Sequence, residues 1–529
     1  MFLSRFHSRF LPCGAAAIAI ALLATGRGVA AGDGARMPGQ FSGELQQFVD
    51  RAHAYAEAAR LGLNYLPGEV VVKFRPGTAP ARQQRALMAL DSRPGVSGLE
   101  WQGDLAVLRD PAQPDAHVLA RQLASQPDVE FASPNYIGKI SPFERRTLPV
   151  SRTPPRRRGW LSFVPNDEDF TALQWNMSLL RMPSAWDIQP GATADIIVAV
   201  IDTGITTAPE TFTFPLWTGL TFEMVSMPVD VNPDLPADRL VSANDFSSTP
   251  TAGAVVDMDG HGSHVSSTIA ETTHNSTLLA GIAWNARIMP LKACTGYWEV
   301  MIGRGLAGTP GFVPSDAGGC SFSQVTAAIR YAADNGAKVI NISIGGGGQF
   351  TPLRDALVYA VSRGAFVAIS MGNDFEDGNE VSYPARYAQD IEGVMSVAAV
   401  GRLEGRAFYS STGPHCEIAA PGGDSRVGGG EHGGVIWQST LFFPDQAPSI
   451  RRPRFDRYNA IGYQGTSMAA PHVAGLAALI MAQSPGVSPG NVEKIIRATA
   501  KDLGTPGKDD DFGNGLIQPR AALFGRGIR

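Results

Sequence analysis

The stretch DIIVAVID, residues 195–202, is an almost uninterrupted apolar run that ends on a carboxylate. Runs of this kind predict strands that are covered on both faces. Similar runs occupy residues 338–343, 365–369 and 394–400, and segments with helical periodicity lie between them. The alternation predicts an α/β fold with a doubly wound, mostly parallel sheet over residues 165–529.

The composition is that of an ordinary globular protein. The chain has 529 residues, of which 44% are hydrophobic and 18% charged, with a formal net charge of -5. This length exceeds the usual single domain, so at least two folded units are expected. A mild net charge without a concentrated basic face argues against nucleic-acid binding.

Residues 1–31 have the order of a signal peptide. Arg5 and Arg9 precede an apolar stretch at residues 13–25, and small residues lead to Ala31. The stretch is shorter than the roughly 20 residues of a spanning helix. We therefore expect export and cleavage, with no stable membrane anchor and an extracellular or periplasmic location.

Three regions separate this leader from the large unit. Residues 32–61 contain a helical run with no visible chemistry, and residues 62–140 predict a small α+β, ferredoxin-like unit. Its expected elements are strands at 68–74, 105–108 and 129–131 and helices at 79–90 and 116–125. Residues 141–164 are basic and proline-rich, with six arginines and four prolines by residue 159. They predict a linker without regular structure, open to proteolysis.

Residues able to carry nucleophilic catalysis occur in three separate segments. Asp202 closes the first strand, His261 lies in DGHGSHV (259–265), and Ser467 lies in GTSMAAPHVAG (465–475). A serine needs a base to accept its proton and an acid to orient that base. Ser467 would begin a helix, whose free N–H groups and positive dipole end favour a developing oxyanion.

The segments VAVIDTG (198–204), HGSHV (261–265) and GTSMAAPHVAG (465–475) resemble the three signature segments of the subtilisin family, in the same Asp, His, Ser order. The resemblance covers roughly residues 165–520. It implies a subtilisin-like serine endopeptidase that hydrolyses polypeptide substrates through an acyl-enzyme. It further implies a monomer that needs no cofactor for catalysis.

The resemblance assigns further roles. Asn373, in SMGN (370–373), would donate to the oxyanion. An open strand edge would pair with the substrate backbone, which predicts fairly broad specificity, and one residue would help to build the specificity pocket. These substrate-binding residues are Ser343, Ile344, Gly345, Gly346 and Ser382.

The N-terminal unit resembles the inhibitory prodomains of the same family, through residues 68–74 and 133–136. This likeness implies that the chain's own propeptide acts as an intramolecular inhibitor and folding chaperone. Its tail would lie in the active site until the enzyme cuts itself free between about residues 137 and 165. Residues 275–281 resemble a loop that holds structural calcium in the family, with Asn275 as the side-chain ligand. An ordinary polar loop remains the alternative.

Cys294 and Cys320 bracket a glycine-rich segment, and export favours a disulfide between them. Cys416 is then left as a small buried thiol. Two functional alternatives stay open beside hydrolysis. One is an inactive binding scaffold, and the other is an acyl transferase or peptide ligase that uses the same acyl-enzyme.

Overall fold

The computed structural model describes residues 43–88, 90, 99–110, 112–140, 143–147, 163–217, 221–251, 254–309, 312–427, 433–443 and 450–527. The predicted signal peptide, residues 1–31, lies outside these ranges, as does most of the predicted linker. No helix within them is both long and apolar enough to cross a membrane.

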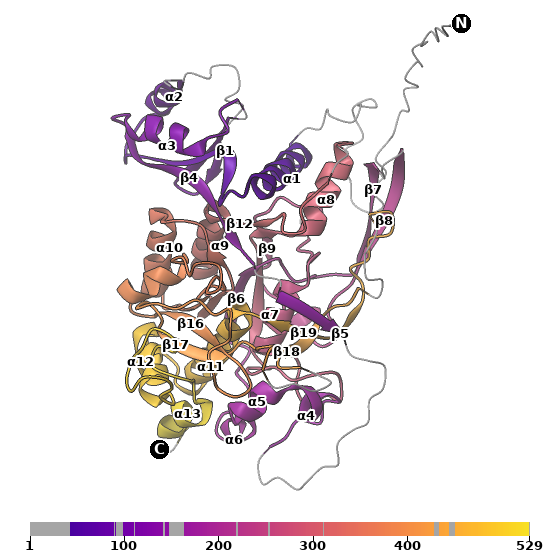
Figure 1. The fold of residues 1–529 in the computed structure, drawn as a ribbon, viewed down its shortest axis with the longest axis vertical. Helices are drawn as coiled ribbons and strands as arrows, with labels where there is room; N and C mark the ends of the chain where they lie inside the picture. The colour runs from indigo at the N-terminus through magenta and orange to yellow at the C-terminus, as the bar shows by residue number, and fades with distance from the viewer. Residues whose placement is uncertain are drawn as a thin grey trace, which may run out of the picture.

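A parallel seven-stranded sheet forms the centre of the larger unit (Figure 1), in the order β17-β16-β15-β13-β6-β10-β9. Its strands are β6 (Ile197–Asp202), β9 (Asn244–Asp245), β10 (Arg287–Lys292), β13 (Val339–Ile342), β15 (Phe366–Ser370), β16 (Val394–Val400) and β17 (Ile418–Pro421). The strands predicted at 338–343, 365–369 and 394–400 are present, and β13, β15 and β16 are buried along their whole length. The doubly wound fold is confirmed.

Helices cover both faces of this sheet (Figure 1). α7 (His261–Ala270) and α11 (Thr466–Gln483) contact each other on one face, and α9 (Phe322–Asp334) and α10 (Thr351–Ser362) lie together on the other. α11 is buried from Thr466 to Met481. A helix that is apolar on every side belongs in the interior, so α11 is enclosed by the sheet and by its neighbouring helices.

Shorter elements complete the larger unit. The helices are α4 (Phe170–Leu173), α5 (Trp175–Leu179), α6 (Met182–Trp186), η1 (Ala237–Arg239), α8 (Tyr297–Leu306), η2 (Ala385–Asp390), α12 (Pro489–Thr499) and α13 (Pro519–Gly527). The strands are the β7 (Glu210–Trp217) and β8 (Phe222–Val229) hairpin, β11 (Cys294–Thr295), β12 (Gly319–Ser321), β14 (Gly345–Gly346), β18 (Ile436–Leu441) and β19 (Tyr458–Gln464).

The N-terminal unit has the expected α+β arrangement. It consists of α1 (Glu44–Leu61), β1 (Tyr65–Phe74), α2 (Pro80–Met88), β2 (Glu100–Gln102), β3 (Leu105–Arg109), α3 (Ala116–Ala124) and β4 (Val129–Lys139). Its strands pair antiparallel in the order β4-β1-β3-β2, over a separate apolar core. β4 continues well beyond the strand predicted at 129–131, because its second half pairs with strands of the larger unit.

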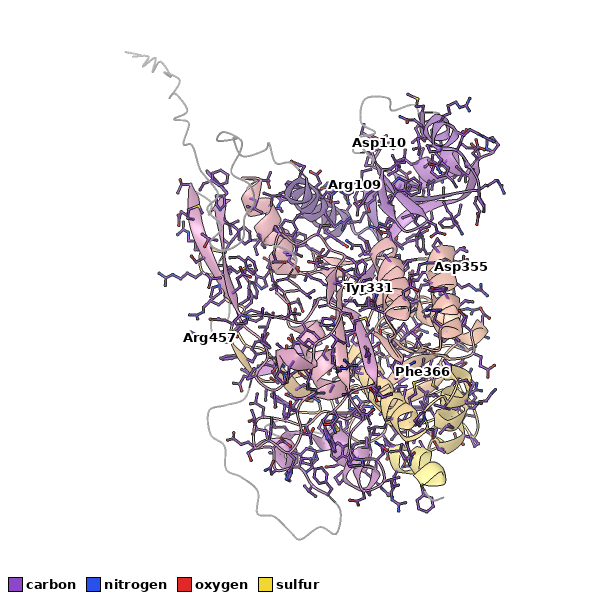
Figure 2. The ribbon with its side chains drawn as sticks, turned by 180° about the vertical axis from the view of Figure 1, so that it is seen from behind. Arg109, Asp110, Tyr331, Asp355, Phe366 and Arg457 are labelled. Atoms are coloured by element: carbon purple, nitrogen blue, oxygen red, sulfur yellow. A yellow bond between two sulfur atoms is a disulfide. The ribbon has the colours of Figure 1, made fainter. Side chains whose placement is uncertain are left out.

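A buried polar network joins the two units. Arg109 Nε lies 2.6 Å from Glu69 Oε2, and Asn135 Nδ2 donates to Glu69 Oε1 at 2.6 Å. Asn135 also bonds twice to Ser323, in the first turn of α9. Burial alone would raise the pKa of Glu69, but Arg109 and these hydrogen bonds hold it below its usual value. From behind, Arg109 stands above α9 and α10, which carry the labelled Tyr331 and Asp355 (Figure 2).

The helical leader has a second contact with the larger unit. α1 packs along α8, and a Cβ on Gly303 would come within 2.4 Å of the Ala52 Cβ. Only glycine therefore allows the two helices to approach this closely. The sequence had assigned no role to residues 32–61; the structure makes α1 a packing element.

The prediction of a linker without regular structure is wrong for residues 143–147. They form β5 (Phe143–Thr147), which pairs antiparallel with β19. Backbone pairing with a free strand edge does not depend on side-chain hydrophobicity, so the basic, proline-rich composition did not indicate this strand. The chain thus pairs with the larger unit before and after residues 141–142, which lie outside the described residues.

Candidate active site

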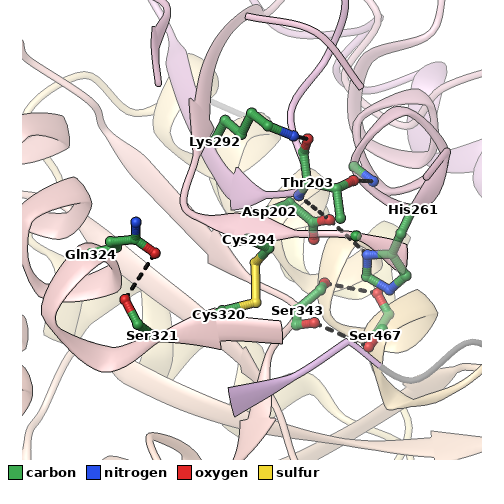
Figure 3. The surroundings of a disulfide bond; sticks show 12 residues. Asp202, Thr203, His261, Lys292, Cys294, Cys320, Ser321, Gln324, Ser343 and Ser467 are labelled. Atoms are coloured by element: carbon green, nitrogen blue, oxygen red, sulfur yellow. Dashed lines mark hydrogen bonds and ion pairs between the residues drawn. A yellow bond between two sulfur atoms is a disulfide. The ribbon is translucent and has the colours of Figure 1, made fainter. Parts of the chain in front are cut away.

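Asp202 and His261 form a hydrogen-bonded pair at the carboxyl end of the central sheet. Asp202 is the last residue of β6, and His261 begins α7. His261 Nδ1 lies 2.7 Å from Asp202 Oδ1, and the side chains are only 2% and 0% exposed. Figure 3 shows the imidazole between Asp202 and Ser467, with its other nitrogen facing the serine hydroxyl.

The electrostatic environment of His261 is set by two opposing effects. Burial lowers the pKa of His261, because desolvation disfavours the imidazolium. The charge and hydrogen bond of Asp202 act in the opposite direction and prevail, so the pKa lies above the usual 6.5. Asp202 Oδ1 also accepts from Thr203 N at 2.7 Å, which holds the carboxylate in place.

Ser467 lies in the first turn of α11, and its side chain is 2% exposed. Its Oγ donates to the carbonyl oxygen of Ser343 at 3.1 Å, and within the described residues His261 Nε2 has no hydrogen-bond partner. The Ser467 hydroxyl thus bonds to Ser343 rather than to His261 in this structure. Such loose contacts are common in enzymes without substrate.

Asn373 follows β15 and lines the same cavity as Ser467. Its Oδ1 accepts from Thr466 N at 2.8 Å and from Thr466 Oγ1 at 3.0 Å. Because these bonds occupy the oxygen, the amide Nδ2 is presented to the cavity that Ser467 also lines. The structure thus brings together the four residues singled out for catalysis: Asp202, His261, Ser467 and Asn373.

A groove beside Ser467 already holds an extended strand. The end of β4, residues 137–139, lies between β12 and β14. On one side Gly138 pairs antiparallel with Cys320, and on the other it pairs with Gly346. A Cβ on Gly138 would lie 2.4 Å from the buried side chain of Ile344, so the strand sits tightly on this wall.

The remaining residues predicted to bind substrate line the same groove. Ser343 Oγ donates to the carbonyl oxygen of Ser467 at 2.8 Å, which ties the wall to the start of α11. Gly346 N donates to Ser382 Oγ at 2.9 Å. The opposite wall, β12, was not predicted from the sequence, because a three-residue strand inside a glycine-rich stretch has no detectable periodicity.

Comparisons with known proteins agree with this geometry. Residues 193–515 match the model of the subtilase family, and residues 52–135 match that of the fervidolysin N-terminal prodomain. The chain belongs to the subtilase family of serine proteases. Its N-terminal unit is a prodomain of the fervidolysin type.

Individual relatives of this subtilase support the assignment. It is 30% identical to thermitase of Thermoactinomyces vulgaris, over 65% of this chain and 94% of thermitase. It is also 30% identical to fervidolysin of Fervidobacterium pennivorans, over 68% of this chain but only 44% of that longer protein. The crystal structure of fervidolysin, described as a keratinolytic enzyme related to subtilisin, superposes with a TM-score of 0.57 at 22% identity. It covers 87% of this chain and 61% of fervidolysin, and this likeness concerns the fold alone.

A disulfide braces the β12 wall of the subtilase groove. Cys294 and Cys320 form the expected bridge, which joins β11 to β12, and Figure 3 shows it close to the Asp202–His261 pair. β11 directly follows the central strand β10, so the bridge ties the end of β10 to the β12 wall of the groove. Cys416 is free and buried, and burial raises the pKa of its thiol far above the usual value.

Sequence reasoning missed Asp257, which organises the turn before α7. Its Oδ1 accepts from the backbone N–H groups of Asp259 and Gly260 and from Thr203 Oγ1, at 2.8 to 3.0 Å. Its Oδ2 accepts from both N and Oγ of Ser263. One carboxylate thus connects the strand end that carries Asp202 to the turn that carries His261. Its proximity to the DGHG segment was the only sequence signal.

A buried ion pair supports the same strand end. Lys292 lies opposite Asp202 in the β6–β10 register, and its Nζ is 2.6 Å from both the Thr203 carbonyl oxygen and Glu299 Oε1. Lys292 and Glu299 are both fully buried. Burial lowers the pKa of Lys292, but Glu299 outweighs this and holds it above its usual value. A lysine inside the otherwise apolar segment 288–293 was the available signal.

The loop considered for calcium lies beside two further buried acids. Asn275 Nδ2 donates to Asp234 Oδ1 at 2.6 Å, and Asn275 Oδ1 accepts from Thr277 N. Glu271 is fully buried next to Asp234, and neither of its carboxyl oxygens has a partner of normal hydrogen-bond geometry among the described residues. Burial raises the pKa of Asp234 to about 6, against the lowering effect of its hydrogen bonds to Asn275 and Glu271. Burial and the neighbouring charge of Asp234 raise the pKa of Glu271 well above its usual value.

Proposed function

We propose that this subtilase is a secreted serine endopeptidase that is made as a self-processing zymogen, with Asp202, His261 and Ser467 as its catalytic triad. The observation that carries the proposal is the buried Asp202–His261 hydrogen bond, whose imidazole faces the hydroxyl of Ser467. A serine, an imidazole and a carboxylate in this order form the arrangement that serine hydrolases use for nucleophilic catalysis.

Acylation begins when the Ser467 hydroxyl turns to His261 Nε2 and attacks the peptide carbonyl. His261 takes the hydroxyl proton and becomes an imidazolium, which Asp202 stabilises through Nδ1–H. The same proton then passes to the leaving amine, the C–N bond breaks, and an ester to Ser467 remains. Water, activated by His261, hydrolyses that ester and restores the enzyme.

Charge on the carbonyl oxygen develops next to two sets of donors. Asn373 Nδ2 is held toward the cavity by the bonds that Thr466 makes to its oxygen. The free N–H groups in the first turn of α11 lie at the same end of the site. Removing one donor of this kind typically costs about 2.7 to 4 kcal/mol of transition-state stabilisation.

The prodomain acts as the intramolecular inhibitor. Residues 137–139 occupy the groove by main-chain pairing, as a substrate would, and β5 pairs with β19 of the larger unit. Because the chain pairs with the larger unit on either side of residues 140–142, self-cleavage is expected there or further along the basic linker. Export by the predicted leader would place this processing outside the cytoplasm.

Calcium is proposed as a structural ion, held by Asp234, Glu271 and Asn275, whose amide would have to turn its oxygen from Thr277 N to the ion. Among the described residues, the buried carboxylate oxygens of Glu271 have no partner of normal hydrogen-bond geometry, and carboxylate oxygens are the ligands that calcium prefers. Within the described residues no three acidic, histidine or cysteine side chains are arranged to hold a metal, so backbone carbonyls of the loop would supply the remaining ligands. When bound, the ion supplies charge compensation and ties this loop to the α7 end.

The function is tested by expressing the precursor with and without Ser467→Ala. The unaltered chain should mature, react with a fluorophosphonate probe and hydrolyse casein, whereas the variant should remain a full-length, unlabelled precursor. Cys416→Ser serves as a matched control, because this buried thiol lies outside the triad. Maturation of purified Ser467→Ala would contradict self-processing, and ligated rather than hydrolysed products would identify a transferase.

A further inference from the structure

A cavity of about 230 Å³ opens beside Ser467, between the wall 345–347 and the segment 370–374. Asn373 is 7% exposed and lines this cavity. The Ser343 carbonyl oxygen is 3.1 Å from Ser467 Oγ. A substrate strand that follows the β4 register therefore places, opposite Ser343, the residue that precedes the scissile bond, and its side chain enters this cavity.

Ser382 limits how deep such a side chain can go. A Cβ on Gly345 would lie 2.7 Å from Ser382 Oγ, and a Cβ on Gly372 would lie 3.0 Å from Ser382 Cβ. Ser382 thus fills the space between the two glycine walls, and it is only 2% exposed. A long side chain can lie between the walls only if its end turns toward the rim.

The rim carries an excess of negative charge. Asp374, Asp377 and Glu380 all line the cavity, and none of them forms an ion pair within the described part of the chain. Two arginines pack against the neighbouring residues but are engaged elsewhere. Arg426 pairs with Glu376 at 2.5 Å, and Arg406 pairs with Asp511 at 3.1 Å. The three rim carboxylates are therefore not neutralised by the peptidase domain.

The prodomain places one cation near these three carboxylates. Lys139, at the end of β4, lines the same cavity. Burial, followed by the charge of Asp377, raises the pKa of Asp374, whereas the Lys139 ammonium lowers it. Lys139 leaves with the prodomain, so a mature enzyme presents the carboxylates without any compensation by a basic residue of the cavity lining.

We propose that this cavity selects arginine or lysine immediately before the scissile bond, with Asp374, Asp377 and Glu380 as specificity-determining residues. The aliphatic stem lies along the glycine walls and the charged head reaches the carboxylates at the rim. An aromatic side chain would instead desolvate these carboxylates without compensation. The inference rests on the proposed peptidase function and narrows the broad specificity that family resemblance implied.

The chain itself contains matching sequences. Six arginines lie in residues 141–159, among them the pair Arg145-Arg146 and the run 156–158. A peptidase with a basic preference could trim this linker after release of the prodomain.

The test uses mature enzyme and fluorogenic peptides that differ only in the residue before the scissile bond: arginine, citrulline, lysine, phenylalanine or glutamate. Citrulline has nearly the shape of arginine but no charge. We expect kcat/KM for arginine to exceed that for citrulline and for phenylalanine by about tenfold or more, equivalent to ~1.4 kcal/mol. The arginine preference should shrink in 1 M NaCl, because two of the carboxylates are exposed.

A double substitution and a matched control test whether the rim carboxylates cause the preference for arginine. Asp374→Asn combined with Glu380→Gln should reduce the arginine-to-citrulline ratio several-fold. Glu376→Gln, on the same segment but paired to Arg426, should leave the ratio unchanged. Equal rates for arginine and citrulline, or a faster rate for phenylalanine, would overturn the specificity while leaving the peptidase intact. Loss of both casein hydrolysis and fluorophosphonate labelling would instead refute the proposed function, and the specificity with it.

Discussion

Two buried acidic centres lie at opposite ends of α7, and they are compensated in different ways. At the N-terminal end, Asp202 meets the imidazole of His261 at 2.7 Å. At the C-terminal end, Glu271 meets another acid, Asp234. The first centre contains its own partner for the negative charge, and the pKa of the imidazole is raised. The second contains no cationic partner among the residues that the structure describes, and the pKa of both carboxyls is raised.

This difference in compensation predicts different roles for the two buried acidic centres. A carboxylate beside an imidazole stays ionised and orients a base, which is useful at every turnover. Two adjacent buried carboxyls can both ionise only when a cation compensates them; otherwise one of them stays protonated. We therefore expect the first centre to control the rate of catalysis and the second to control stability.

The largest expected effect is on catalysis. Asp202→Asn should keep the fold, since the amide has nearly the same shape, but should lower kcat about 10⁴-fold by favouring the wrong tautomer of His261. Steady-state kinetics on a peptide substrate measure the loss, with circular dichroism as the check on folding. Activity within tenfold of the unaltered enzyme would remove Asp202 from the proposed triad.

The acid pair should respond to calcium and to its own removal. For the inactive Ser467→Ala precursor, a chelator should lower the apparent Tm at pH 8 by several degrees, since binding to the folded state alone stabilises it. Adding Glu271→Gln should abolish most of this response, because the pair then carries one charge fewer. Glu376→Gln, which removes an exposed carboxylate, is the matched control. An undiminished calcium response in Glu271→Gln would exclude Glu271 as a ligand.

Without calcium, the same pair gives stability a definite pH dependence. The folded pKa of Asp234, about 6, and that of Glu271 lie above those of an unfolded chain, so the folded state binds more protons. Their contribution is therefore fully present at low pH and is lost as pH rises through about 6. The Tm of the chelated Ser467→Ala precursor should decrease from pH 5 to pH 8, and less so with Glu271→Gln. A uniform rise across this range would contradict the assignment.

The smallest expected effect is a shift in the catalytic pH profile. The pKa of His261 is raised, and only the neutral ring can accept the Ser467 proton. The acid limb of kcat/KM should therefore have its midpoint above 6.5, and the residual activity of Asp202→Asn should have its midpoint at lower pH. Coincident midpoints for the two enzymes would show that Asp202 does not set the pKa of His261.

Local patterns in the chain were sufficient for much of this description. The apolar runs identified β13, β15 and β16 to within a residue or two, because strands covered on both faces must be apolar throughout. The segments around Asp202, His261 and Ser467 pointed to one site. By contrast, β5 and the long end of β4 were missed, because both depend on pairing with distant strand edges.

Sequence alone determined which residues are equipped for chemistry, because the type of a side chain and its place at a strand end or helix start are local properties. The tertiary structure decided which charges face each other: Lys292 with Glu299, Glu271 with Asp234, and three carboxylates around the cavity beside Ser467 that form no ion pair with any described residue. Burial and distance between segments far apart in the chain set these interactions, and neither quantity is written in any single segment.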